Sequence, residues 1–592
     1  MTAAIDHATL PAWNLDDLYP GRDSPELARA LREMEAAAKA FAAAHAGKVS
    51  KLDGVGLAAA ISEYERIDEV LSRVMSYASL TYSGAMTDPE IAKFYQSMQE
   101  RVNAISTHLV FFTLEINRIE DKDLEAKLKT KALGHWRPWL TDVRAFRPHQ
   151  LSDEIERLLH EKHVVGRAAW NRLFDETIAG LRFPLDGQDL TISDTLNLMS
   201  DKDRATRRKA AETLGEVLGR NARIFALVTN TLAKDKEIED KWREYPRPVS
   251  SRNLSNRVED GVVDALATAV RAAHPDLSHR YYRLKARWFG GDRLDYWDRN
   301  APLPDDDDRL VPWAEARSLV LDAYGRFSPD LAAVGRRFFD NAWIDAAPRA
   351  GKSPGAFAHP TVPSAHPYLL LNYHGRTRDV MTLAHELGHG VHQVLAGGQG
   401  HLLSDTPLTL AETASVFGEM LTFRTLLERE TDAKRRKALL AGKVEDMLNT
   451  VVRQIAFYTF EERVHDERRT GELTAERLGE IWLDVQTESL GPALRFDEGY
   501  RAYWAYVPHF IHTPFYVYAY AFGDCLVNSL YAVYQDADRG FAQTYMAMLA
   551  AGGTKRHKEL LAPFGLDATD PAFWQKGLGV IRGFVDELEA MG

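Results

Sequence analysis

The sequence has a single cysteine, Cys525, among its 592 residues. One thiol cannot form a disulfide within the chain, and it excludes a metal site built from several thiolates. Such scarcity of cysteine suits a reducing compartment, so we expect a cytoplasmic protein.

Long apolar runs are also missing. No uninterrupted run approaches the roughly 20 residues that a membrane-spanning helix needs. The aromatic segment 502–534 comes nearest, but His509, Pro514 and Asp524 interrupt it. The first residues, MTAAIDHATLPAWNLDDLYPG, lack the basic stretch and apolar core of a secretory signal. We therefore expect neither a membrane partner nor export.

Positive charge is in deficit, because 73 lysines and arginines stand against 85 aspartates and glutamates, a net charge of −12. Nucleic-acid binding needs basic side chains clustered on one face, so we expect no nucleic-acid partner. Hydrophobic residues make up 45% of the chain and charged residues 27%, which is ordinary for a globular protein. The length suggests about three or four core units, one of which could be a large helical body.

Helical spacing of apolar residues dominates the first half of the chain. It runs through residues 25–125, starting after Ser24, and returns over residues 152–178 and from about residue 200. The segment LRFPLDGQDLTI alternates around Asp186 and Gly187, which predicts a short hairpin. The acidic run Asp305 to Asp308 predicts a solvated loop.

The amino-acid composition changes at residues 344–375. Glycine, serine and proline are common there, and the apolar run PYLLLNY comes next. This pattern predicts a short edge or buried strand. We therefore expect a small strand-containing element directly before the segment 379–398.

The segment DVMTLAHELGHGVHQVLAGG, residues 379–398, places His385 and His389 four apart around Glu386. On a helix, residues four apart share one face, so both imidazoles can bind one metal ion. The helix has a separate apolar stripe that would pack against the protein interior, formed by Leu383, Leu387 and Val391. We expect Asp379 to cap the start of the helix and Gly397 and Gly398 to end it.

Glu386 suits the role of general base, because a carboxylate beside the metal can take a proton from bound water. Chance alone places such a pentapeptide in roughly one chain in twenty of this composition. The surrounding sequence must therefore decide whether it is a metal site.

A catalytic zinc needs a third protein ligand and one open position. Glu412 comes 23 residues after His389, on a second helix that starts near Pro407, and Glu419 shares its face. Glu412 is the candidate ligand, and Glu419 is a candidate partner for a ligand's other edge. The alternative is a capping box between Thr409 and Glu412. His392 is a rival candidate for the third ligand. The alternative for His392 is that it is an ordinary packed or exposed histidine.

A second candidate cluster lies in YVPHFIHTPFYVYAYAFGD, residues 506–524. Tyrosine hydroxyls and neutral histidines can stabilise the oxyanion of a tetrahedral intermediate. Tyr516 and Tyr520 are four apart, and His509 and His512 precede them. The alternative is an aromatic core helix, although its many polar tips would each need a partner.

Three separated motifs resemble the oligoendopeptidase F branch of peptidase family M3: DVMTLAHELGHGVH, AETASVFGE and PHFIHTPFYVYAYAFG. Flanking segments such as WNLDDLYPG and AGGTKRHKELLAPFGLD are similar too, so the likeness covers nearly the whole chain. The resemblance implies a mainly α, two-lobed metallopeptidase body with a deep substrate channel.

The resemblance also assigns roles to residues. It implies one zinc ion per chain held by His385, His389 and Glu412, with Glu386 as the general base. It gives oxyanion stabilisation to the downstream histidines and tyrosines, for which we select His509, Tyr516 and Tyr520, with His512 and Tyr518 in reserve.

We therefore expect a zinc-dependent endopeptidase that hydrolyses internal bonds of short, unfolded peptides. Residues 1–195 are expected to form an N-terminal helical region and residues 196–592 the catalytic region. Two other functions remain open, namely an inactive helical protein that binds peptides like a chaperone and a zinc exopeptidase on a similar scaffold. The sequence does not determine the oligomeric state or the preferred cleavage site.

Overall fold

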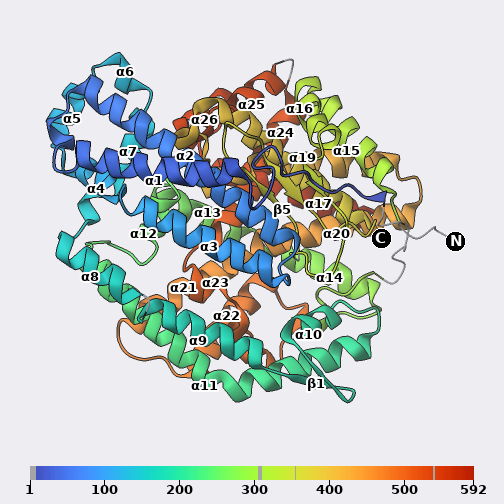
Figure 1. Cartoon of the computed structure of the whole chain (residues 1–592). Helices are drawn as coiled ribbons and strands as arrows, with labels where there is room; N and C mark the ends of the chain where they lie inside the picture. Colours follow the sequence, from blue (N-terminus) through green and yellow to red (C-terminus); the bar gives the residue numbers. More distant parts are fainter. Residues whose placement is uncertain (1–8, 164, 304–309, 354, 538–539) are drawn as a thin grey trace. The chain divides into compact units, whose positions relative to one another are not determined.

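A computed structural model describes residues 9–163, 165–303, 310–353, 355–537 and 540–592. Helices make up most of the chain, and the strands are short (Figure 1). The acidic run Asp305 to Asp308 lies outside the described residues. The chain forms two compact units, each assembled from separate segments. Unit 1 contains Met1–Arg147, Asp308–Arg429 and Asp536–Gly565, and unit 2 contains Pro148–Asp307, Glu430–Gln535 and Leu566–Gly592.

Unit 1 combines helices from three separate segments of the chain with a small sheet. Its helices are α1 (Pro25–His45), α2 (Gly54–Gly84), α3 (Pro89–Ser106), α4 (Val110–Arg118), α5 (Asp121–Lys127), α6 (Lys131–Gly134), α7 (Arg137–Ala145), α15 (Trp313–Phe327), α16 (Pro329–Asp340), α17 (Thr377–Ala396), α18 (His401–Ser404), α19 (Leu408–Arg429), α25 (Phe541–Leu549) and α26 (His557–Leu561). Its strands are β4 (Ile344–Asp345), β5 (Phe357–His359) and β6 (Tyr368–Leu370).

Unit 2 is also mainly helical. Its helices are α8 (Asp153–His163), α9 (Arg167–Gly180), α10 (Ile192–Leu198), α11 (Arg204–Trp242), α12 (Ser250–Ser255), α13 (Asp260–Ala273), α14 (Ser278–Trp288), α20 (Ala433–Thr450), α21 (Val452–Arg468), α22 (Ala475–Leu490), α23 (His509–His512), α24 (Tyr518–Asp536) and α27 (Pro571–Ala590). Its strands are β1 (Phe183–Leu185), β2 (Gln188–Leu190), β3 (Leu294–Asp295) and β7 (Leu494–Arg495).

The sheet of unit 1 has the strand order β4-β6-β5. β4 runs parallel to β6, and β5 pairs with β6 in the antiparallel direction, with Ala358 opposite Leu369. Tyr368, Leu369 and Leu370 are fully buried, which explains why this run of three apolar residues forms the central strand. The strand element expected before the histidine pair is confirmed.

Helix α17 carries the histidine pair and packs against α19. The stripe Leu383, Leu387 and Val391 is fully buried, as its four-residue spacing predicts. On another face, a Cβ atom at Gly388 would lie 2.4 Å from the Ala414 carbonyl oxygen of α19. Glycine is therefore required at this position because the two helix backbones approach so closely.

The start of α17 differs from the expectation. The helix begins at Thr377 with Arg376 as its N-cap, so Asp379 lies inside the first turn and is not the cap. The Asp379 carboxylate accepts hydrogen bonds from the backbone N–H groups of His374 and Arg376, both at 2.9 Å. Asp379 thus provides an acceptor for backbone N–H groups that precede the helix, as the acidic member of a capping box does. Gly397 ends the helix as predicted.

Other local predictions are confirmed. β1 and β2 form an antiparallel hairpin whose turn residues, Asp186 and Gly187, both have positive φ, at 50° and 84°. That conformation matches the right-handed twist of the paired strands. α1 begins at Pro25, and the Ser24 side chain accepts a hydrogen bond from the backbone N–H of Leu27.

The mainly α fold expected from the sequence is confirmed. Across the described residues, every helix is too short or too polar to cross a bilayer. The division at residues 195 and 196 and the deep substrate channel stay predictions.

Candidate metal centre

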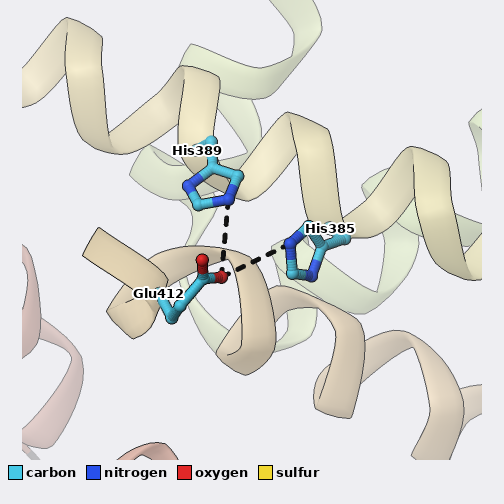
Figure 2. Close-up of side chains that lie close together, drawn as sticks. All are labelled: His385, His389 and Glu412. Atoms are coloured by element: carbon cyan, nitrogen blue, oxygen red, sulfur yellow. Dashed lines mark ion pairs between the residues drawn. The ribbon is translucent and has the colours of Figure 1, made fainter. Parts of the chain in front are cut away.

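The side chains of His385, His389 and Glu412 converge within unit 1 (Figure 2). One carboxylate oxygen of Glu412 lies 3.4 Å from Nε2 of His385 and 3.5 Å from Nε2 of His389. The histidines come from consecutive turns of α17, and Glu412 comes from α19. One donor atom from each residue lies within 4.8 Å of the others.

This donor set fits a divalent metal ion in tetrahedral coordination. With bonds of about 2.0 Å, two ligand atoms of a tetrahedral zinc ion are about 3.3 Å apart. The two distances from Glu412 to the histidines, 3.4 Å and 3.5 Å, are close to that separation. Two imidazoles with one carboxylate leave a fourth position for water or substrate, which is the arrangement of a catalytic site.

Each of the three side chains is oriented by a further contact. Glu419 lies 3.2 Å from Nδ1 of His385, so Nε2 is directed toward Glu412. The ring of His389 interacts with the backbone of Ala411 in α19. The Ser415 hydroxyl donates to the Glu412 carboxylate at 2.7 Å. Such contacts hold metal ligands in the rotamer that binding requires.

Glu386 follows the first histidine and is almost fully buried, with 8% of its surface exposed. Burial and the nearby charge of Glu412 raise its pKa to about 7, although His385 and a hydrogen bond from the Ala358 N–H of β5 oppose the rise. A carboxylate with a pKa near neutrality can both accept and return a proton under physiological conditions.

The histidine environments differ. Burial lowers the pKa of His389 to about 4, which favours the neutral imidazole that a metal ion requires. Burial also lowers the pKa of His385, but the hydrogen bond to Glu419 and the negative charge of Glu412 outweigh it and raise the pKa to about 9. Of the three acidic side chains around it, Glu419 has the largest effect on His385.

A cavity of about 590 Å³ adjoins the centre within unit 1. Its walls include His389 and His392 of α17, the segment 360–363 and Thr406. Its volume is typical of a pocket that holds a small ligand or part of a peptide. His392 is buried and lines this cavity. It is not one of the three converging side chains.

In unit 2, the structure brings His509, Tyr516 and Tyr520 together. The Tyr520 hydroxyl lies 3.4 Å from Nε2 of His509. The ring of Tyr516 is nearly parallel to that of His509, with centroids 6.1 Å apart, and its centroid lies 5.2 Å from that of Tyr520. These three side chains form one cluster, which we call the His-Tyr cluster.

The two reserve residues have other partners. His512 lies 2.8 Å from the Asp175 carboxylate of α9. The hydroxyl of buried Tyr518 accepts a hydrogen bond from Asn256 at 2.8 Å. Both contacts direct these side chains toward their own neighbours, and the catalytic role of His509, Tyr516 and Tyr520 stays a prediction.

Sequence reasoning missed the contact from Ala358 to Glu386 and the contact from Ser415 to Glu412. The first involves only a backbone N–H, so no residue type could have indicated it. The second had a signal, because Ser415 lies three residues after Glu412 on one helix, where side chains are neighbours.

A mainly helical chain in which a His-Glu-x-x-His helix meets a distant glutamate has the site of a metal-dependent peptidase. The model of peptidase family M3 matches residues 329–580, and the model of oligopeptidase F matches residues 115–183. Oligopeptidase PepF of Bacillus subtilis is 25% identical over 594 residues, which cover 98% of this chain and 87% of the relative.

Solved structures share the fold. One from Chlamydophila abortus has a TM-score of 0.85 at 21% identity and covers 100% of both chains. Oligoendopeptidase-F from Enterococcus faecium has a TM-score of 0.71 at 23% identity, covering 96% of this chain and 97% of that one. The chain thus carries a peptidase family M3 domain at residues 329–580 and an oligopeptidase F domain at residues 115–183, and the relative that matches nearly its whole length is an oligopeptidase of the same kind. It is a metallopeptidase of short peptides.

Proposed function

We propose that this chain is a zinc endopeptidase that cuts internal bonds of short, unfolded peptides. The observation that carries the proposal is the convergence of Glu412 with His385 and His389 beside the buried carboxylate of Glu386. Nitrogen ligands with one carboxylate favour zinc among the abundant divalent metals. When bound, zinc supplies a Lewis acid that lowers the pKa of water and polarises a carbonyl.

Glu386 is the general base of this reaction. Its carboxylate takes a proton from the attacking water and then returns that proton to the amine that leaves. Its burial next to the candidate ligands keeps this carboxylate close to the water that it would deprotonate.

His509, Tyr516 and Tyr520 stabilise the oxyanion in this proposal. Tyrosine hydroxyls and a neutral imidazole donate hydrogen bonds without adding charge, which suits a developing oxyanion. Burial and the positive charge of Arg453 lower the pKa of His509, so its ring is neutral at physiological pH. The close grouping of the three rings, with the Tyr520 hydroxyl 3.4 Å from Nε2 of His509, supports this assignment.

We also propose a cytoplasmic location, from the scarcity of cysteine. The reducing conditions there would leave Cys525 as a buried thiol. Peptide fragments are the substrates expected in that compartment.

The test is cleavage of an internally quenched peptide with both ends blocked, followed by mass spectrometry of the products. Internal cuts that stop with EDTA and return with zinc are expected, together with about one zinc ion per chain by elemental analysis. Cleavage only of peptides with free ends would replace the endopeptidase by an exopeptidase. Peptide binding without any cleavage, in metal-replete protein, would overturn the enzymatic proposal.

A further inference from the structure

The turn between α23 and α24 carries an unusual backbone conformation. Phe515, directly before Tyr516, has φ of +59°. A bulky non-glycine residue adopts positive φ only where its surroundings impose it, and such positions concentrate at functional sites. The side chain of Phe515 is buried, with 1% exposed, and packs against Tyr458 and His465 of α21.

Polar side chains of unit 2 hold the backbone of this turn from several directions. The Phe515 N–H donates a 2.8 Å hydrogen bond to one carboxylate oxygen of Glu461. Arg252 donates to the Pro514 carbonyl at 3.2 Å. Arg167 donates to the Ile511 carbonyl at 3.1 Å. These contacts come from α21, α12 and α9, which are far apart in the sequence.

Burying the carboxyl group of Glu461 at this position costs free energy of folding. Only 2% of its surface is exposed, and among the described residues its second carboxylate oxygen, Oε2, has no hydrogen-bond partner. Burial raises its pKa to about 8, although the Phe515 N–H opposes the rise. A leucine or methionine would fill the same volume without desolvating a carboxyl group. The feature that a hydrophobic residue lacks is the acceptor for Phe515.

We propose that Glu461 is a positioning residue for the His-Tyr cluster, because it fixes the backbone at Phe515 and thereby the direction of the Tyr516 side chain. The inference rests on the proposed function of that cluster. Tyr516 follows Phe515 immediately, so a change in the Phe515 backbone rotates the Tyr516 ring away from His509 and Tyr520. Arg252 supports the same turn from the neighbouring residue, Pro514.

The first experiment compares Glu461→Leu and Glu461→Gln in the full-length, metal-loaded enzyme with a quenched peptide. Leucine removes the acceptor, and kcat is expected to fall by about 10-fold to 100-fold, with KM changed by less than about 3-fold. Glutamine retains an acceptor oxygen and should keep kcat within about 3-fold of the original. Glu462→Gln is the matched control, because Glu462 faces Tyr458 and Arg247 and has no contact with the Phe515 N–H.

The second experiment separates positioning from stabilisation of the fold. If Glu461 acts through Tyr516, Glu461→Leu should cost much less kcat in a Tyr516→Phe background than alone. A merely structural role predicts the same loss in both backgrounds. Should Glu461→Leu not fold, as judged by circular dichroism, the same cycle is run with Arg252→Met, which removes the contact to the Pro514 carbonyl and should show the same coupling to Tyr516.

Two results would overturn the inference. One is an unchanged kcat in folded Glu461→Leu, and the other is a loss that adds fully to that of Tyr516→Phe. Failure of the proposed function would be recognised separately, because the unsubstituted enzyme would then leave the peptide intact.

Discussion

The Tyr324 hydroxyl donates a 2.6 Å hydrogen bond to the Ala384 carbonyl, one residue before the metal-binding candidate His385. This hydroxyl occupies the space that Gly418 leaves on α19, where a Cβ atom would lie 2.1 Å from it. Tyr545 of α25 makes a similar bond, at 2.8 Å, to the carbonyl of Thr413, one residue after Glu412. Buried tyrosines thus fix the backbone beside two of the three candidate ligands.

Tyr324→Phe should destabilise unit 1. It removes a buried hydrogen bond while keeping the ring, so the free energy of unfolding should fall by about 0.5 to 1.5 kcal/mol. Urea denaturation followed by circular dichroism measures the change. Tyr82→Phe, at a partly exposed tyrosine of α2 in the same unit, is the control. Equal stability of Tyr324→Phe and the unsubstituted protein would show that the Ala384 contact contributes nothing.

Glu386→Gln should retain metal while losing most activity. Glutamine has nearly the same shape, but it cannot take a proton from water, so kcat should fall by at least about 100-fold. Metal content by elemental analysis should stay at the level of the unsubstituted protein. Turnover at the original rate would contradict the general-base role.

Glu412→Gln should weaken metal binding more than Glu419→Gln does. The first substitution removes the anionic member of the ligand set, whereas the second removes a residue that only orients His385, an effect of about 10-fold to 100-fold. Competition with a chromophoric chelator gives both affinities. An unchanged affinity in Glu412→Gln would exclude Glu412 as a ligand.

Gly388→Ala should separate α17 from α19. The added methyl group would meet the backbone of Ala414, which cannot move independently of its helix, so we expect a loss of about 1 to 3 kcal/mol in stability. Metal affinity should fall as well, because Glu412 lies on the displaced helix. Gly442→Ala is the control, since nothing lies within 4 Å of a Cβ atom at that position. Equal effects of the two substitutions would contradict the close approach.

The pH dependence of stability should report on Glu461. Its pKa is raised from 4.5 to about 8, so between these pH values the folded protein binds more protons at this site than the unfolded chain. Stability should therefore decrease as pH rises through this window and level off above pH 8. The nearby charges of Arg252 and Lys236 limit the effect, and that of Glu462 increases it.

Glu461→Gln carries no titrating group at this position and should lack that part of the slope. The measurement is urea denaturation of both proteins at several values from pH 5 to pH 8. A constant difference in unfolding free energy between them would contradict the raised pKa.

Local features were predictable from the sequence because they depend on neighbours along the chain. Four-residue spacing placed His385 and His389 on one helical face, and Asp186-Gly187 specified the hairpin turn. The apolar run at Tyr368 marked the central strand. The N-terminus of α17 was less predictable, since Arg376 and Asp379 both contribute to it and small shifts in a helix start leave the periodicity unchanged.

The convergence of distant residues was decided by packing. Spacing alone could not distinguish a ligand role for Glu412 from a capping box with Thr409, and the orientation of α19 against Gly388 directs its carboxylate toward the histidines. Packing also places Asp175, more than 300 residues earlier in the sequence, beside His512, a contact that local spacing could not indicate.

The sequence by itself determined the chemical groups of this peptidase and their local spacing, because the pitch of a helix and the geometry of a turn are fixed by backbone sterics. Only the tertiary structure decided which groups meet, as with Glu461 and the N–H of Phe515. The physical reason is that contacts between remote segments depend on how buried surfaces fit together, and that fit is a property of all the packed side chains at once.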